Sequence, residues 1–317
     1  MIKLKNKKAI ERTYLIGIIV LVVSFAIILL FFSRLGMNTG SGASVQQACY
    51  ASVVLRGVAA SNILKSEFRE AIPLKCNTTR ICLTAGGDCE SLGNNYEKIK
   101  VKTREDVLDA IAQNMYDWHM TLNEGNSNFM PQGFTEKKFC ILNSIISLDV
   151  ETKNMIKENP ISRLDLYSYL QTKKDSNGQS YLKDLLKIDD VSKIKDLKPI
   201  KGEVEGIEIK IFEIPLNFSE DQVIISSLVE SSKWESIIGG TTVGAVVAAA
   251  VGLILVPITG GTSLTVTVIA LGGTGSGLAT FYYSKPSPNS GYQYSAPTIT
   301  SHNNLDKLEC SGFEGLI

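Results

Sequence analysis

The sequence predicts an α+β domain on the exterior side of a membrane, with an N-terminal transmembrane helix and a transmembrane helical hairpin in the C-terminal half. Three observations favour this fold class. Long uncharged apolar runs lie near both ends of the chain, helix and strand periodicities fill the middle, and every cysteine follows the first apolar run. The predicted parts are a basic cytoplasmic tail (1–13), an anchor (14–32), a flexible spacer (33–47), the exterior domain (48–233), the hairpin (234–283) and an exterior linker and tail (284–317).

The predicted anchor is an apolar run of about 19 residues, long enough to cross a hydrocarbon core of ~30 Å. Five bases against one acid precede it, at Lys3, Lys5, Lys7, Lys8 and Arg12. A cleaved signal peptide has a shorter apolar region that ends at small residues, whereas this run ends in Phe31-Phe32-Ser33-Arg34. The sequence therefore favours an uncleaved anchor that leaves residues 1–13 in the cytoplasm and the bulk of the chain outside the cell.

Cysteine usage fits an exterior location. All six cysteines lie beyond the anchor, at Cys49, Cys76, Cys82, Cys89, Cys140 and Cys310. An even number on the oxidising side predicts disulfides, although six cysteines allow 15 pairings. Because the five cysteines of the exterior domain cannot all pair among themselves, Cys310 is predicted to bond back to that domain. Metal binding is disfavoured, since no pair has Cys-x-x-Cys spacing and only two histidines are present.

Charge excludes one class of partner. Residues 1–34 hold six of the 32 bases and one of the 32 acids, which leaves 26 bases and 31 acids for the exterior part. This mildly acidic balance offers no basic field for nucleic acid. Asn77-Thr78-Thr79 and Asn217-Phe218-Ser219 match the glycosylation acceptor pattern, so Asn77 and Asn217 are candidate acceptors.

The exterior domain contains one clear amphipathic helix. Residues 97–101 alternate as a strand, and Thr103-Arg-Glu-Asp106 then resembles a capping box. Apolar residues follow at helical spacing, at Val107, Leu108, Ile111, Met115, Trp118 and Leu122. The helix is expected to end in the loop 123–128.

The remaining elements are predicted from shorter signals. We expect strands over 139–148 and 206–212, helices over 162–170 and from 181 to 186, and a further apolar run over 223–228. Residues 49–89 indicate β-structure with loops, including a turn at 85–88 before Cys89, but a helix over 49–70 stays open.

The predicted hairpin consists of two uncharged runs separated by a Pro/Gly turn at 257–262. Small residues recur at helical spacing, at Gly240, Gly244, Ala248 and Gly252 in the first run and at Gly273 and Gly277 in the second. Such stripes let helices pack closely in lipid. A full crossing and a re-entrant loop both fit, and burial of a helix in a large soluble core is the alternative.

Candidates for chemistry are few. Asp117 and His119 are two apart on the predicted helix and therefore point to different sides, and His302 lies in a polar tail. The segment Gly272–Gly277 lacks the Lys-Ser/Thr ending of a phosphate loop, and Glu124 alone is weak evidence for a cation site. The sequence predicts no catalytic residue, cofactor or metal site.

The order of features resembles a family. It comprises the anchor, the cysteines, a helix that runs into Asn123-Glu124-Gly125-Asn126, the Phe139-Cys140 strand, the 165–170 and 180–182 pieces, the hairpin and the terminal Cys310. The chain is similar over most of its length to uncharacterised membrane-anchored proteins with exterior cysteine-containing domains from small-genome archaea. The resemblance implies no assigned activity.

Three functions are compatible with these features. The first is a non-enzymatic membrane surface protein with a structural or interaction role, which assembles through the hairpin. The second is a membrane-perturbing or pore-forming protein, and the third is an exterior enzyme with an unrecognised site. The first is preferred, with the lipid bilayer, a homo-oligomer or other membrane proteins as partners.

Overall fold

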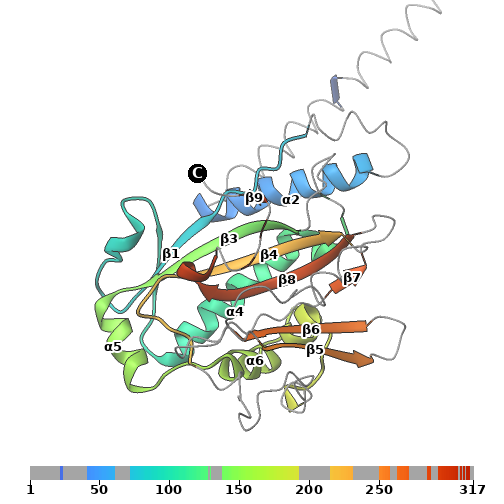
Figure 1. Ribbon diagram of the computed structural model, residues 1–317. Helices are drawn as coiled ribbons and strands as arrows, with labels where there is room; N and C mark the ends of the chain where they lie inside the picture. Colours follow the sequence, from blue (N-terminus) through green and yellow to red (C-terminus); the bar gives the residue numbers. More distant parts are fainter. Residues whose placement is uncertain are drawn as a thin grey trace, which may run out of the picture. The chain divides into compact units, whose positions relative to one another are not determined.

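A central strand, β3 (Lys138–Leu148), organises the fold in the computed structural model (Figure 1). The structure describes residues 22–23, 41–60, 72–127, 129, 138–192, 215–230, 250–257, 263–270, 284–286, 292–305, 308, 310 and 312–314. The chain divides into two units, Met1–Ser44 and Val45–Ile317, and the sheet belongs to the second.

The sheet has seven strands in the order β2-β1-β3-β4-β8-β7, with β9 also paired to β3. Besides β3, its strands are β1 (Thr79–Thr84), β2 (Glu97–Lys100), β4 (Gln222–Glu230), β7 (Ser284–Pro286), β8 (Tyr292–Ser301) and β9 (Gly312–Glu314). β1 pairs with β3 in parallel over 144–148, and β9 pairs in parallel with the preceding residues 139–141 of the same strand. β4 runs antiparallel along its other edge.

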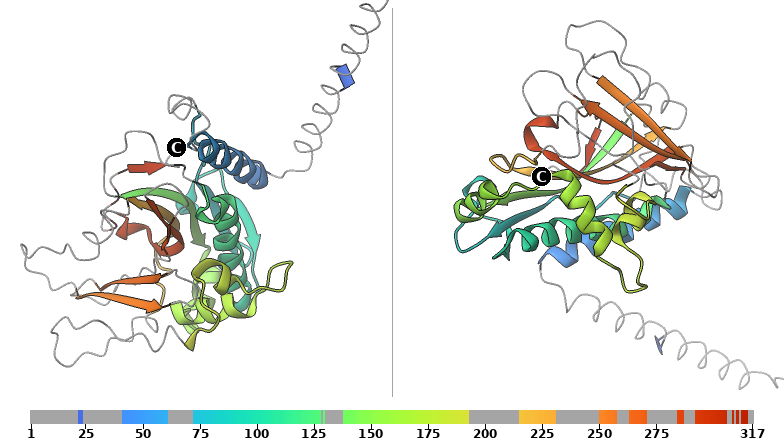
Figure 2. Two further views of the ribbon diagram at one scale, coloured as in Figure 1. Left: turned by 90° about the vertical axis from the view of Figure 1, so that its right-hand side faces the viewer. Right: turned by 90° about the horizontal axis from the view of Figure 1, so that it is seen from below.

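One face of the sheet carries the main hydrophobic core. It packs against α4 (Arg104–Thr121), α6 (Arg163–Thr172) and α7 (Tyr181–Leu186), which lie on one side of the sheet in Figure 2. Trp118 of α4 is fully buried, and its indole nitrogen donates a 2.8 Å hydrogen bond to Ser144 Oγ of β3. The indole N–H therefore keeps a partner inside the core, as buried tryptophans require.

The opposite face is covered differently. Two small clusters replace a continuous core, one around Cys140, Ile225 and Leu308 and one around Cys82, Cys89 and Leu92. Each contains a disulfide, Cys140–Cys310 and Cys82–Cys89 respectively. Covalent bonds thus fasten two short segments where few apolar side chains are available to hold them.

Several sequence predictions are confirmed. α4 begins with the predicted capping box between Thr103 and Asp106, and α6 begins with the same motif at Ser162 and Asp165. β2, β3 and α7 also lie where the periodicity placed them. The helix left open over 49–70 exists as α2 (Ser41–Ala60), although it starts inside the predicted spacer.

The disulfide prediction is confirmed as well. The three bonds are Cys49–Cys76, Cys82–Cys89 and Cys140–Cys310, so the six cysteines are all paired. Cys310 is bonded back to the domain, as the odd number of the other cysteines required.

The predicted transmembrane architecture is wrong. Within the described residues, no helix is both long and apolar enough to cross a membrane. Part of the expected helical hairpin is an antiparallel strand pair, β5 (Ala250–Pro257) and β6 (Ser263–Ala270). Gly252, expected on a helix face, instead pairs with Val268 in this ladder. The physical reason is that β6 alternates Thr with Val, two β-branched residues that favour extended backbone.

Other parts of these predictions fall outside the described residues. These are the anchor except for residues 22–23, the packing residues Gly240, Gly244, Ala248, Gly273 and Gly277, and the strand expected over 206–212.

Five further elements were not predicted. The predicted linker and tail contain β7, β8, η4 (His302–Asn304) and β9, and α5 (Val150–Glu158) follows β3 directly. β8 contains the buried Tyr294 near its start, and it pairs with β4 on one edge and with β7 on the other.

Candidate interaction site

The candidate site is the crossover loop, residues 85–96, which connects β1 to β2. These two strands are neighbours and parallel, with Cys82 opposite Lys98. A parallel pair needs a connection of about a dozen residues or more, because the chain must return to the starting end. The crossover loop is near that minimum, and it passes over the thinly covered face of the sheet.

The underside of the loop is anchored to the sheet. The Cys82–Cys89 disulfide joins β1 to the start of η1 (Glu90–Leu92), and Leu92 is buried beside it. Ser91 Oγ lies 2.9 Å from Ser147 Oγ of β3 and donates a 2.9 Å hydrogen bond to the Asp221 carboxylate. The loop is therefore tied to β1, to β3 and to the segment that precedes β4.

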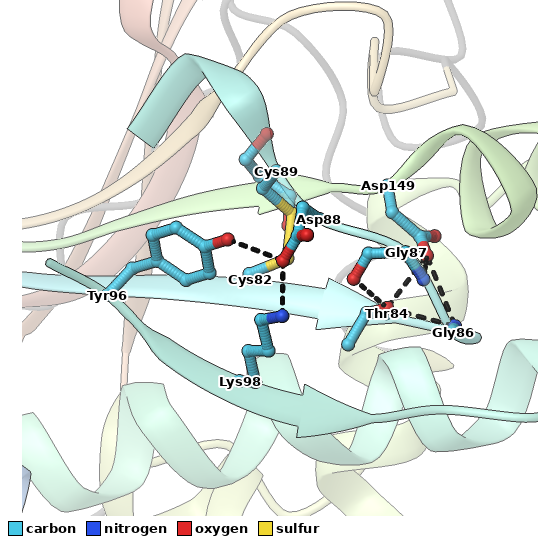
Figure 3. Close-up of polar contacts among 10 residues, drawn as sticks. Cys82, Thr84, Gly86, Gly87, Asp88, Cys89, Tyr96, Lys98 and Asp149 are labelled. Carbon is cyan, nitrogen blue, oxygen red and sulfur yellow. Dashed lines mark hydrogen bonds and ion pairs between the residues drawn. A yellow bond between two sulfur atoms is a disulfide. The ribbon is translucent and has the colours of Figure 1, made fainter. Parts of the chain in front are cut away.

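The first turn of the loop is held by the buried carboxylate of Asp149, which Figure 3 shows facing the turn. Its Oδ2 accepts hydrogen bonds from Gly87 N at 2.7 Å, Gly86 N at 3.3 Å and Thr84 Oγ1 at 2.7 Å. Its Oδ1 accepts from Thr152 N at 2.8 Å and so caps the N-terminus of α5. One side chain, 62 residues after Gly87, thus joins the crossover loop to the start of a helix.

These hydrogen bonds decide the charge state of Asp149. Burial favours the protonated acid, but the bonds donated by Thr152, Thr84 and Gly87 outweigh it and hold the pKa of Asp149 far below its ordinary value. The carboxylate is therefore charged and fully used as an acceptor.

The outer side of the loop presents a fixed charged group, which we name the Asp88 triad (Asp88, Tyr96 and Lys98). Asp88 Oδ1 accepts a 2.9 Å hydrogen bond from Tyr96 Oη and forms an ion pair with Lys98 Nζ (Figure 3). The side chains of Asp88 and Lys98 are 66% and 50% exposed. Lys98 and Tyr96 both donate to Asp88 and lower the pKa of its carboxyl group.

This arrangement is suited to recognition. Its charged groups are already paired with each other, and the backbone that carries Asp88 is fixed from both sides. Across the described ranges, no group of three or more His, Cys, Asp or Glu side chains is placed to hold a metal ion. Rigid exposed loops bind partners at a lower entropic cost than mobile ones.

The sequence candidates lie elsewhere. Asp117 accepts a 2.8 Å hydrogen bond from Gln113 on the same helix, whereas His119 is buried with Nδ1 3.4 Å from Tyr294 Oη. The two point to different sides, as the spacing predicted. His302 is exposed, and Asn77 and Asn217 are both exposed, so glycosylation there stays a prediction.

Only part of this site could be predicted from the sequence. The turn before Cys89 was visible, but Asp149 was not recognised as its partner. The signal that was available is local, since Asp149-Val-Glu-Thr152 directly after a strand is a good helix N-terminus.

Asp149 gives the first prediction. Asp149→Ala should lower the free energy of unfolding by roughly 3 kcal/mol, because it removes a helix cap and charge-assisted hydrogen bonds in a buried place. Urea unfolding at neutral pH measures the change. Asp149→Asn is the matched variant, because it keeps the shape and loses the charge.

The pH dependence of the same site has a definite sign. The folded-state pKa lies below the unfolded value of about 3.9, so the stabilisation is present above that value and is lost as the pH falls from there towards the folded pKa. The stability difference between the wild-type chain and Asp149→Asn should therefore shrink between about pH 5 and pH 2. A difference that is constant over this range would contradict the role given to the carboxylate.

The fold and site define a class, a disulfide-tied mixed α/β domain with an anchored crossover loop. No protein-family model, curated protein or solved structure matches this chain. The resemblance to membrane-anchored proteins of small-genome archaea stays a prediction.

Proposed function

We propose that this chain is a non-enzymatic interaction protein that works in an oxidising compartment outside the cytoplasm. The three disulfides support the compartment, because such bonds persist in secreted and exterior proteins and are rare where thiols are kept reduced. The pore-forming alternative depended on the helical hairpin and is not carried forward.

The observation that carries the proposal is the anchoring of an exposed loop from both sides. The disulfide Cys82–Cys89 holds the loop from below, and Asp149 holds its first turn. Binding loops lose affinity when they must be ordered on contact. A loop already fixed, with Asp88 exposed on it beside the exposed Lys98 of β2, is a contact element ready for a partner with polar and charged groups.

A crosslinking experiment tests this role. A photo-crosslinking amino acid at Glu90, an exposed position of the crossover loop, should give an adduct of defined mass on native cells. Asp88→Ala should reduce that adduct about tenfold or more, because truncation of a hot-spot residue at an interface costs about 2 kcal/mol or more. The same probe at Asp189, which forms an exposed ion pair with Lys183 on another element, is the matched control.

Two results of this crosslinking experiment would contradict the proposed role of the crossover loop. Equal adducts at 90 and 189, or an adduct at 90 that Asp88→Ala leaves unchanged, would overturn the proposal. Asp88 is exposed, so unchanged circular dichroism should accompany the substitution and separate a binding effect from misfolding.

A further inference from the structure

The described part of the chain contains three buried lysine or arginine side chains, Arg56, Lys138 and Arg163. The guanidinium of Arg56 donates hydrogen bonds to two backbone carbonyl oxygens, and Lys138 Nζ donates one to a third. Arg163 differs from both, because its Nε is buried and has no hydrogen-bond partner. Buried charges in proteins are normally paired and hydrogen-bonded, so this unpartnered guanidinium requires an explanation.

No acidic side chain of the described residues forms an ion pair with Arg163. The acid nearest to it in sequence is Asp165, which is already committed. Its Oδ2 accepts hydrogen bonds from the backbone N and the Oγ of Ser162 and forms a 2.7 Å ion pair with Arg104 Nη2. Burial lowers the pKa of the Arg163 guanidinium, but an arginine stays protonated at neutral pH. The positive charge is therefore present and is not balanced by Asp165.

Tyr167 is the buried neighbour of Arg163 on α6. It lies four positions later, so the two side chains share one side of the helix. Burial raises the pKa of the Tyr167 phenol, and the charge of Arg163 opposes this shift without reversing it. The phenol is therefore neutral, and Tyr167 is not the counter-ion of Arg163.

Arg163 also has an unfavourable position in its helix. It is the first residue of α6, directly after the N-cap Ser162. The first turn of a helix lies at the positive end of the helix dipole, where a cation is disfavoured and an anion is favoured. The guanidinium is thus both desolvated and attached to a positive helix end, and a bound anion would offset both penalties.

We propose that Arg163 binds a small monocarboxylate ligand. Nε and one Nη lie on one edge of the guanidinium and can donate two parallel hydrogen bonds to a carboxylate, and Nε is the atom that lacks a partner. One negative charge neutralises one positive charge, whereas a phosphate group, with a charge of about −1.5 to −2 at pH 7, would leave excess charge in a buried place. Because Arg163 is only 5% exposed, a small ligand reaches it more readily than the surface of another protein does. The inference goes beyond the proposed interaction role and does not depend on the crossover loop.

Thermal unfolding of the full chain, with sodium acetate replacing sodium chloride at constant ionic strength, tests the proposal. So small a ligand should bind with a Kd on the order of 1 mM. At about 100 mM acetate, the Tm of the wild-type chain should therefore rise by about 5 °C more than the Tm of Arg163→Met, which lacks the guanidinium.

Two further variants separate the guanidinium edge from its charge. Arg163→Lys keeps the charge but loses the two parallel donors, so it should bind acetate about tenfold more weakly and show roughly half of the rise in Tm. Lys183→Met is the matched control, because it removes one positive charge from a side chain that is 50% exposed. It should respond to acetate like the wild-type chain.

The same variants supply a test that needs no ligand. In chloride alone, Arg163→Met should melt at or above the Tm of the wild-type chain, because it removes a buried charge that has no partner. A Tm well below that of the wild-type chain would show that Arg163 is already satisfied and would overturn the proposal. Equal responses of the wild-type chain and Arg163→Met to acetate, or an Arg163-dependent rise that is larger with inorganic phosphate than with acetate, would also overturn it. Asp88→Ala should respond to acetate normally, so this experiment and the crosslink at position 90 report on different proposals.

Discussion

Removal of the Cys140–Cys310 disulfide is expected to lower the free energy of unfolding by about 5 kcal/mol, the largest effect of any of the three disulfides. This bond joins residues 170 apart, whereas the separations are 27 for Cys49–Cys76 and 7 for Cys82–Cys89. Because a crosslink restricts the unfolded chain more when it closes a longer loop, the other two should contribute about 3.5 and about 2.4 kcal/mol. Urea unfolding of the three paired Cys→Ala variants measures the series.

The structure adds a local reason for the same ranking. The described part of the C-terminal strap, residues 302–305, 308, 310 and 312–314, is held by the disulfide, by three residue pairs between β9 and β3, and by Leu308 in a small cluster. Lys138 Nζ also donates a 3.1 Å hydrogen bond to the Leu308 carbonyl oxygen. Without the disulfide, hydrogen exchange should become faster in β9 before it does so in β1. A Cys82→Ala/Cys89→Ala variant that loses as much stability as the strap variant would contradict the loop-length argument.

Elements with strong local signals could be predicted from the sequence. The capping box of α4 needs only Thr103 and Asp106, and its apolar face repeats over five turns. The prediction that Cys310 bonds back to the domain needed only the odd number of the other cysteines and their shared location on the predicted exterior side. Such features depend on residues close in sequence or on a count, so they do not require knowledge of the fold.

The hairpin prediction failed because hydropathy does not distinguish an apolar helix from a pair of apolar strands. The run before the Pro/Gly turn and the run after it each have the length of a membrane span, but β6 reads Ser-Leu-Thr-Val-Thr-Val-Ile-Ala with alternating β-branched residues. That period-2 pattern indicates a strand, and it predicts the observed structure better than the small residues in the neighbouring sequence do.

β8 was missed because Pro297 lies in its middle, and proline is normally excluded from interior strands. In the structure, the pairing of β8 with β4 shifts register between Ile225 and Ser227. Pro297 lies in that irregularity, outside the paired residues, so its missing N–H leaves no gap in the ladder. The partnership of Asp149 with the crossover loop was also invisible, since it joins residues that only the parallel β1–β3 pairing brings together.

The second large effect is expected at Gly125, in the turn that ends α4. Gly125 has φ +71°, and a Cβ placed there would lie 2.2 Å from Cδ1 of Tyr294, which is fully buried. Gly125→Ala should therefore cost about 4 kcal/mol of unfolding free energy, of which about 1–2 comes from the left-handed backbone and the rest from overpacking against the ring. Urea unfolding measures the loss, and near-ultraviolet circular dichroism reports on the displaced Tyr294.

Gly178 provides the matched control for this prediction. Its φ is +80°, and nothing lies within 4 Å of the position that a Cβ would take. Gly178→Ala should therefore cost only the backbone strain of about 1–2 kcal/mol. The turn at Gly125 has no easy way to relax, because Asn123 and Glu124 already have φ near +50° and the Asn123 side chain donates a 2.7 Å hydrogen bond to Ser127. If the two alanine variants lost the same stability, the contact with Tyr294 would have no part in fixing the turn, and the packing of β8 on α4 would have to depend on other residues.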